Sequence, residues 1–311
     1  MVLLATYAKM NATLKQLYII LSGAAIQKKN ETIMSPIEER IAGESQPEPD
    51  VPLPDSLPGD TLVEALQRHG IKLPKSQTAK IDAYCQLLWE KNQHLNLTRH
   101  TDYEKFVSRD LVDTLRLSEL LTQGEHLLDV GTGGGVPGIL LAILRPDLKI
   151  ELCDATGKKA IVVGEIVDAL RLDLPVWHAK GENLLKIHRF QTLVFRAVAR
   201  IKKIMELFSP HWHAFDRMLL IKGPRWVEER GESRHFGQMG KAALRKLDSY
   251  NIPGTEIESV ILQICLKEKL EKLAEHGGAI PPAPVKEKRR RGFATKMKRN
   301  TKQQSKSPGN R

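Results

Sequence analysis

Residues 127–138 read Leu-Leu-Asp-Val-Gly-Thr-Gly-Gly-Gly-Val-Pro-Gly, and this stretch decides the fold. Its first four residues are typical of the end of a buried parallel strand. The alternate glycines that follow tolerate positive φ and let a ligand approach without meeting a Cβ. Pro137 at the first helical position then opens a helix over 137–144, because its missing N–H would have no intrahelical partner there. Strand, glycine turn and helix N-terminus together predict a cradle for a nucleotide cofactor.

Alternating strands and helices follow this stretch. Strands are predicted at 149–154, 174–179, 192–198 and 217–222, and a final strand or hairpin at 256–267. Helices are predicted at 158–172, 202–208 and 241–250. Strands interleaved with helices indicate crossover units and a mostly parallel sheet. We expect the last strands to be antiparallel additions at the sheet edge.

Helical patterns precede the glycine stretch, at 62–71, 76–95 and 106–120. The sequence therefore predicts an α/β fold with a helical N-terminal cap over 61–122 and a Rossmann-like core over 123–268. Residues 1–60 are expected to be a disordered extension that ends in an acidic, proline-rich linker. Residues 269–311 are expected to be a disordered basic tail.

The net charge of +11 is unevenly distributed. Residues 283–311 contain eleven Lys or Arg and one acid, whereas residues 31–60 contain eight acids and only Arg40. Much of the predicted attraction to polyanions therefore belongs to the tail. The three cysteines are scattered, which argues for a reducing compartment and against a disulfide framework or a zinc site. No apolar run approaches the length of a membrane span.

Two acids discriminate between candidate cofactors. Asp154 ends the second predicted strand, where a carboxylate can accept hydrogen bonds from both ribose hydroxyls of an adenosine ligand, or can simply begin the next helix. Asp129 directly precedes the glycine turn, where it would repel the pyrophosphate of a nicotinamide cofactor but suit a ligand with ammonium and sulfonium cations. The position of Asp129 therefore favours S-adenosylmethionine over a nicotinamide cofactor, and disfavours a nicotinamide-dependent oxidoreductase.

Several segments, in order, resemble the glucose-inhibited division protein B family, also called RsmG. They are Asp129–Gly138, Leu152–Lys159, Phe195–Val198 and Ile221–Gly223, together with cap signatures at Tyr84–Thr98 and Arg109–Asp113. The similarity runs from about residue 62 to 268. It implies a class I S-adenosylmethionine-dependent methyltransferase fold and methyl transfer to guanine N7 in small-subunit (16S) ribosomal RNA.

The resemblance also implies cofactor contacts at Gly131, Val136, Gly181, Glu182 and Arg196. With the residues of the cradle itself, the predicted cofactor site is Asp129, Gly131, Gly133, Gly135, Val136, Asp154, Gly181, Glu182 and Arg196. The chain departs from the family pattern at Phe195, Asp110 and Thr114, where serine, histidine and serine are usual.

Guanine N7 has a free lone pair, so in-line attack needs no general base, and Arg196 is expected to orient the cofactor or the target base. Lys158, Lys159 and Lys222 are candidate RNA contacts, although solvated lysines are the alternative. No metal is expected, although His211-Trp212-His213 raises the question. The expected protein is a cytoplasmic monomer that acts on 16S ribosomal RNA or the small subunit. The alternative function is a noncatalytic RNA-binding or ribosome-assembly factor on the same fold.

Overall fold

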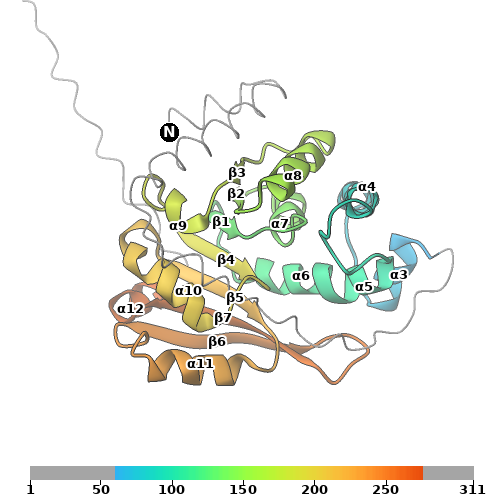
Figure 1. Cartoon of the computed structure of the whole chain (residues 1–311). Helices are drawn as coiled ribbons and strands as arrows, with labels where there is room; N and C mark the ends of the chain where they lie inside the picture. Colours follow the sequence, from blue (N-terminus) through green and yellow to red (C-terminus); the bar gives the residue numbers. More distant parts are fainter. Residues whose placement is uncertain (1–59, 276–311) are drawn as a thin grey trace, which may run out of the picture. The chain divides into compact units, whose positions relative to one another are not determined.

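The computed structural model describes residues 60–275. They form a seven-stranded sheet in the order β3-β2-β1-β4-β5-β7-β6 (Figure 1). The first five strands in this order are parallel, and β7 and β6 add an antiparallel edge. The strands are β1 (His126–Val130), β2 (Lys149–Asp154), β3 (Val176–His178), β4 (Thr192–Arg196), β5 (Arg217–Lys222), β6 (Ala242–Asn251) and β7 (Glu258–Leu266). The predicted mostly parallel sheet with an antiparallel edge is confirmed.

Helical segments precede the sheet and connect its strands. The cap consists of α3 (Leu62–Arg68), α4 (Lys75–Asn92), α5 (Tyr103–Lys105), the π-helix η2 (Phe106–Leu111) and α6 (Val112–Ser118). The core helices are α7 (Gly138–Leu144), α8 (Gly157–Ala169), α9 (Gly181–Leu184), α10 (Ile201–Phe208), η3 (Ser209–Ala214), α11 (Trp226–His235), η4 (Lys267–Lys269) and α12 (Leu270–Glu275). The helical character of the predicted cap is therefore confirmed, whereas the proposed domain limits stay predictions.

The sheet is buried on both faces, as expected for parallel strands with crossover helices. Successive residues of β1 point to opposite faces, so Leu127 joins one apolar cluster while Leu128 and Val130 join another. The first cluster unites the cap with α7 and α8. The second unites α10 with β5 and β7. The cap thus packs on the same face as the helix that follows the glycine turn.

The prediction of a helix over 241–250 is wrong. These residues form β6, which pairs antiparallel with β7 from Ala242 opposite Leu266 to Asn251 opposite Glu258. Ala, Leu, Lys and Arg are good helix formers, but tertiary pairing overrides such local preferences. The helix in this part of the chain is instead α11, which the sequence reading did not predict.

One smaller difference concerns an element end. Pro137 is the N-cap of α7 rather than its first helical residue, a shift within the usual uncertainty of helix boundaries. The predictions for residues 1–59 and 276–311 lie outside the described residues. Within 60–275, no helix has the length and apolar character that a membrane span requires.

Candidate active site

The glycine turn takes the conformation that the alternating glycines predicted. Gly131, Gly133 and Gly135 all have positive φ, at 68°, 59° and 102°. At Gly135, a Cβ would also lie only 2.5 Å from Cδ1 of Ile139, so a larger residue there would disrupt the start of α7. The turn is tied to β2 because the backbone N–H of Gly131 donates to the carbonyl of Cys153 at 2.9 Å. The turn lies at the carboxyl ends of β1 and β2, where cofactors of Rossmann-like folds bind.

Asp129 braces the turn from inside the protein. Asp129 is only 1% exposed, and its Oδ2 accepts hydrogen bonds from Thr132 Oγ1 at 2.7 Å and from the Gly138 N–H at 3.0 Å. Burial raises the pKa of this carboxyl to about 6, against the opposing effect of the two hydrogen bonds. Asp129 therefore joins the two ends of the turn. Its contact with the cofactor stays a prediction.

Asp154 lies at the end of β2, next to the same turn. Its Oδ2 accepts from the Gly133 N–H at 3.0 Å, and its Oδ1 accepts from the Thr156 N–H at 2.7 Å, just before α8. The carboxylate thus reaches the glycine turn and also orders the start of the next helix. The position fits the predicted ribose contact, which stays a prediction.

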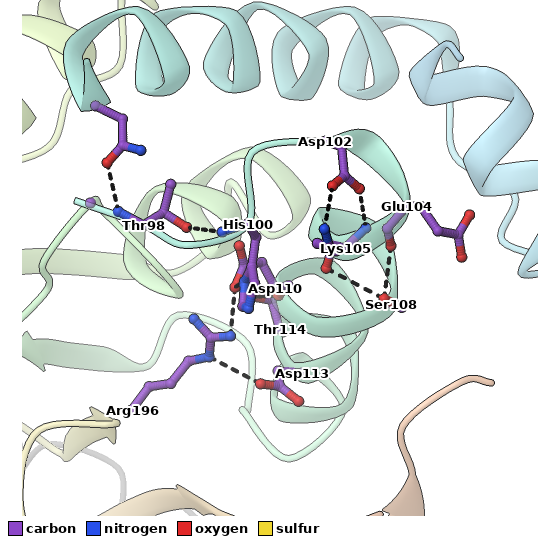
Figure 2. A network of polar contacts seen from close by, with 12 residues as sticks. Thr98, His100, Asp102, Glu104, Lys105, Ser108, Asp110, Asp113, Thr114 and Arg196 are labelled. Carbon is purple, nitrogen blue, oxygen red and sulfur yellow. Dashed lines mark hydrogen bonds and ion pairs between the residues drawn. The ribbon is translucent and has the colours of Figure 1, made fainter. Parts of the chain in front are cut away.

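Arg196, at the end of β4, is clamped by two carboxylates from the cap. Its Nη2 donates to Asp110 Oδ1 at 2.5 Å and its Nε donates to Asp113 Oδ2 at 3.0 Å (Figure 2). His100 Nδ1 also lies 2.9 Å from Asp110 Oδ1, and the Tyr250 hydroxyl donates to Asp113 Oδ1 at 2.6 Å. The arginine side chain is 17% exposed, so part of it remains accessible. The cap therefore fixes the direction in which Arg196 points.

The carboxylates outnumber the guanidinium in this network. Burial disfavours the charged form of Asp110, but Arg196 and His100 outweigh it and hold the pKa of the carboxyl below its usual value. Burial also opposes the charge on Arg196, yet the two aspartates raise its pKa further. The Oδ2 of Asp110 is buried and has no hydrogen-bond partner within residues 60–275. A buried carboxylate oxygen without a partner indicates a place for a donor or cation that is not part of the chain.

The cap also supports the glycine turn directly. Tyr84 of α4 is fully buried, and its hydroxyl donates to the carbonyl of Gly134 at 2.9 Å. Asn92 Oδ1 accepts from the N–H groups of Leu97 and Thr98 at 2.8 and 3.0 Å, which orders the loop that leaves α4. A Cβ on Gly134 would lie 2.9 Å from Leu88 Cδ1. The turn is therefore held between the sheet and the cap.

The other predicted cofactor residues lie at this end of the sheet. Gly181 and Glu182 begin α9 after β3, and a Cβ on Gly181 would lie 2.9 Å from Cγ1 of Val130 at the end of β1. Val136 is half-buried and packs against the apolar cluster that unites cap and core. The carboxyl ends of β1, β2, β3 and β4 thus bring all the predicted cofactor residues to one edge. Their contacts with a cofactor stay predictions.

The three candidate RNA contacts differ in environment. Lys158 is exposed and Lys159 half-buried at the start of α8. Lys222 Nζ instead donates to the carbonyl of Ala199 at 2.6 Å and to Glu229 Oε2 at 2.8 Å, and its side chain is 10% exposed. Lys222 is thus engaged inside the chain, an arrangement that does not favour a phosphate contact.

Sequence reasoning did not assign roles to several residues of this site. Asp110, Asp113 and Tyr84 lie in the quoted cap signatures, and this was the signal that could have identified them. Tyr250 lies on β6, which was predicted as a helix, and His100 carries no local signal. The substituted positions are accommodated: Thr114 Oγ1 donates to the carbonyl of Asp110 at 2.7 Å, and Phe195 is buried edge-on to Phe208. Within residues 60–275, no group of three or more His, Cys, Asp or Glu side chains is arranged to hold a metal.

Comparisons with known proteins identify relatives of this chain. The family described as rRNA small subunit methyltransferase G (GidB) matches residues 77–253. A Rhodopirellula baltica protein named Ribosomal RNA small subunit methyltransferase G is 48% identical over 186 residues, covering 60% of this chain and 80% of that one. A protein of the same name from Lachnoclostridium phytofermentans is 31% identical over 218 residues, covering 68% and 89%. The solved O-methyltransferase from Bacillus cereus, in complex with SAH, is 14% identical with a TM-score of 0.44, covering 65% and 97%.

The sheet order, the glycine turn after β1 and the acid after β2 define a class I, Rossmann-like methyltransferase that uses S-adenosylmethionine. The family match covers more than half of the sequence. The chain belongs to the GidB family of rRNA small subunit methyltransferases. The family resemblance and the enzyme class predicted from the sequence are confirmed.

Proposed function

We propose that the protein transfers the methyl group of S-adenosylmethionine to N7 of a guanine in small-subunit ribosomal RNA. The observation that carries the proposal is the pairing of the glycine cradle with the Arg196 network at one edge of the sheet, in a chain of this family. The choice of N7 rests on the family resemblance. Attack by N7 would require no general base, because this atom carries no proton.

The residues of the site fit the cofactor. Gly133 is the glycine of the turn that leaves space beside the backbone, because a Cβ there would meet nothing closer than 4.0 Å. Asp110 and Asp113 both pair with the Arg196 guanidinium, the carboxyl of Asp129 is buried at the glycine turn, and one buried oxygen of Asp110 lacks a partner within the described residues. This excess of negative charge suits a ligand with ammonium and sulfonium cations. Asp154, Gly181 and Glu182 would hold its adenosine end, and Arg196 its amino-acid end.

S-adenosylmethionine supplies an electrophilic methyl group. The chain itself contributes position and charge. Arg196 is held by Asp110 and Asp113, so its direction is fixed before any substrate binds. The N7 lone pair carries no proton, and catalysis then consists of aligning N7 with the methyl group. We propose that Arg196 orients the reactants and that no side chain removes a proton.

The proposed RNA partner requires an accessible base. The deep, narrow major groove of A-form RNA hides N7, so the target guanine must be unpaired or extruded from its helix. Lys158 and Lys159 are proposed phosphate contacts on the α8 side of the cradle. An RNA contact of Lys222 stays a prediction, and the ion pair of Lys222 with Glu229 does not favour it. We further propose that the protein works as a cytoplasmic monomer.

Mapping of N7-methylguanine tests the proposal. Small-subunit ribosomal RNA from cells lacking the protein is incubated with the purified chain and S-adenosylmethionine, and each modified guanine is located by mass spectrometry of RNA fragments. We expect one new N7-methylguanine, lost when Arg196 is replaced by Lys, which keeps the charge but not the bidentate geometry. Methylation at another base atom would refute the N7 assignment, and no methylation would refute the function.

A further inference from the structure

A basic groove lies at the far edge of the sheet, away from the cofactor cradle. It has a volume of about 530 Å³ and is bounded by the end of α11, the turn that follows it and the first residues of β6. Arg234, Arg245 and Lys267 line it together with Gly237, Met239 and Gly240. We call this surface the edge groove. It is not part of the site described above, and the proposed reaction does not use it.

The charge of the edge groove has one sign. Its lining within the described residues contains two arginines and one lysine but no acid. All three cationic side chains belong to exposed residues. Lys267 Nζ donates to the carbonyl of Gly240 at 2.8 Å, which fixes it beside the turn that closes the groove. Three cations around one cavity raise the local concentration of polyanions.

The backbone of the groove adds donors. β6 is the last strand of the sheet, so one side of its backbone pairs with β7 and the other side does not pair within the sheet. Unpaired N–H groups along such an edge can donate to anionic oxygens. Charged residues on an edge strand also have a simpler role, because they discourage edge-to-edge aggregation. The experiment must separate these two roles.

The sheet register places the groove toward the amino ends of the parallel strands, with Arg245 as its strand residue nearest the active site. Arg245 is opposite Gln263 of β7, which is opposite Leu219 of β5, three residues before the reaction end of that strand. Strand spacing and rise put Arg245 roughly 14 Å sideways from β4 and about 10 Å along the strands from its carboxyl end, whereas Ala242, opposite Leu266, lies roughly 20 Å along the strands from that end. An RNA whose target base lies beside Arg196 could therefore extend past the sheet edge to the groove.

We propose that the edge groove binds the phosphate backbone of ribosomal RNA flanking the target guanine. This inference rests on the proposed function for its substrate. The groove is open to solvent, and its lining offers cations and backbone donors without any base-specific set. The groove positions the RNA and does not choose the base. An acidic protein partner is the competing occupant, and the test below distinguishes it.

The test compares two triple variants of the full chain. In the first, Arg234, Arg245 and Lys267 are replaced by Gln. In the matched control, the exposed Lys72, Lys75 and Lys80 on the outer cap are replaced by Gln, which removes the same charge elsewhere. Binding of small-subunit ribosomal RNA is measured across a salt series, and S-adenosylmethionine binding is measured by calorimetry to show that both variants retain the cradle.

We expect the groove variant to bind the RNA at least tenfold more weakly at moderate salt, with a salt slope lower by about two to three. The control variant should change both quantities much less, and S-adenosylmethionine affinity should match that of the unmodified chain in both. Equal losses in the two variants would mean that only net charge matters and would overturn the proposal. Unchanged RNA binding with increased aggregation by light scattering would also overturn it, in favour of edge protection. Unchanged RNA binding without aggregation would also overturn the proposal. The competing occupant, an acidic protein, would then be favoured.

These outcomes are independent of the reaction. A chain that methylates another position of the RNA, or none, would still reveal the groove through the difference in binding between the two variants. Conversely, a groove variant with normal RNA binding would leave the N7 proposal intact.

Discussion

At the scale of single residues, Asp129 has a buried carboxyl group that also holds the glycine turn through two hydrogen bonds. Its pKa of about 6 lies above that of an aspartate in an unfolded chain, because burial disfavours the carboxylate. The folded state therefore binds more protons between about pH 4 and 6. The contribution of Asp129 to the free energy of unfolding falls as the pH rises through this window. We propose that the ionised form is nevertheless the one that attracts the cationic cofactor.

The fold favours protonated Asp129, whereas cofactor binding is expected to favour the ionised form. The affinity for S-adenosylmethionine should therefore depend on pH. The affinity for S-adenosylmethionine should increase on the order of tenfold from pH 5 to pH 7, as Asp129 ionises. Asp129→Asn keeps an acceptor for Thr132 and Gly138, and it should abolish most of that increase. Calorimetric titrations at several pH values measure both. The idea fails if the two chains show the same pH dependence, in which case another group of the site titrates.

Ala197 is a second residue of interest, because its backbone conformation is unusual. It follows Arg196 and has a φ of 53°, in the left-handed region that costs a residue with a Cβ about 1 kcal/mol or more. The turn it makes brings Val198 against Gly131, where a Cβ would lie 3.0 Å from Val198 Cγ2. The chain therefore accepts strain next to its orienting arginine.

Ala197→Gly should relieve this strain. We expect the free energy of unfolding to rise by up to about 1 kcal/mol, measured by urea denaturation. Arg171 has a φ of 52° in the turn after α8, far along the chain from Arg196, and Arg171→Gly is the matched control for relief of the same strain. Ala197→Val should instead lower the unfolding free energy, since β-branched residues are poorly tolerated at positive φ. A destabilised Ala197→Gly chain would show that the backbone here is not strained.

At the scale of elements, the cap is part of the cofactor cradle rather than an appendage. Helix α4 contacts the glycine turn through the Tyr84 hydroxyl, and η2 and α6 supply the two carboxylates that hold Arg196. The π-helical geometry of η2 falls at Asp110, and irregular turns of this kind are frequent at functional sites. Loosening the cap should therefore weaken cofactor binding.

Tyr84→Phe tests this coupling. The variant leaves the buried carbonyl of Gly134 without its donor, which should cost about 1–3 kcal/mol of unfolding free energy and reduce S-adenosylmethionine affinity. Tyr103→Phe is the control, because the Tyr103 hydroxyl donates to Asp82 within the cap and does not touch the turn. It should leave cofactor affinity unchanged. Equal cofactor affinities in the two variants would show that the Tyr84 bond contributes only to stability.

Local patterns predicted the parallel strands and the glycine turn but not β6. Apolar runs such as Leu219-Leu220-Ile221 are buried wherever the sheet forms, so they indicate strands by themselves. The segment Lys241–Tyr250 has helix-favouring composition and becomes a strand only because β7 pairs with it. The same limit applies to the site. The partners of Arg196 lie 86 and 83 residues away, and Tyr250 lies 137 residues from Asp113, so no local pattern could join them.

At the scale of the whole molecule, charge is divided between the fold and its flanking sequences. The residues that precede the fold are acidic over 31–60, whereas residues 283–311 contain eleven cationic side chains and one acid. The edge groove adds three more cations on the described part of the chain. We therefore propose that attraction to RNA has a component from the tail, which acts without sequence preference, and a component from the fold, which depends on geometry.

Removal of the tail should separate these components. Deletion of residues 283–311 should reduce the slope of log affinity for ribosomal RNA against log salt, because fewer counterions are released when fewer cations meet phosphates. Methyl transfer at low salt should persist, because the cradle and the Arg196 network lie within residues 60–275. A full-length chain with the tail lysines and arginines replaced by Gln controls for length and should behave like the deletion. An unchanged slope in both would mean that the tail does not contact RNA and that the fold alone, including the edge groove, carries the electrostatic binding.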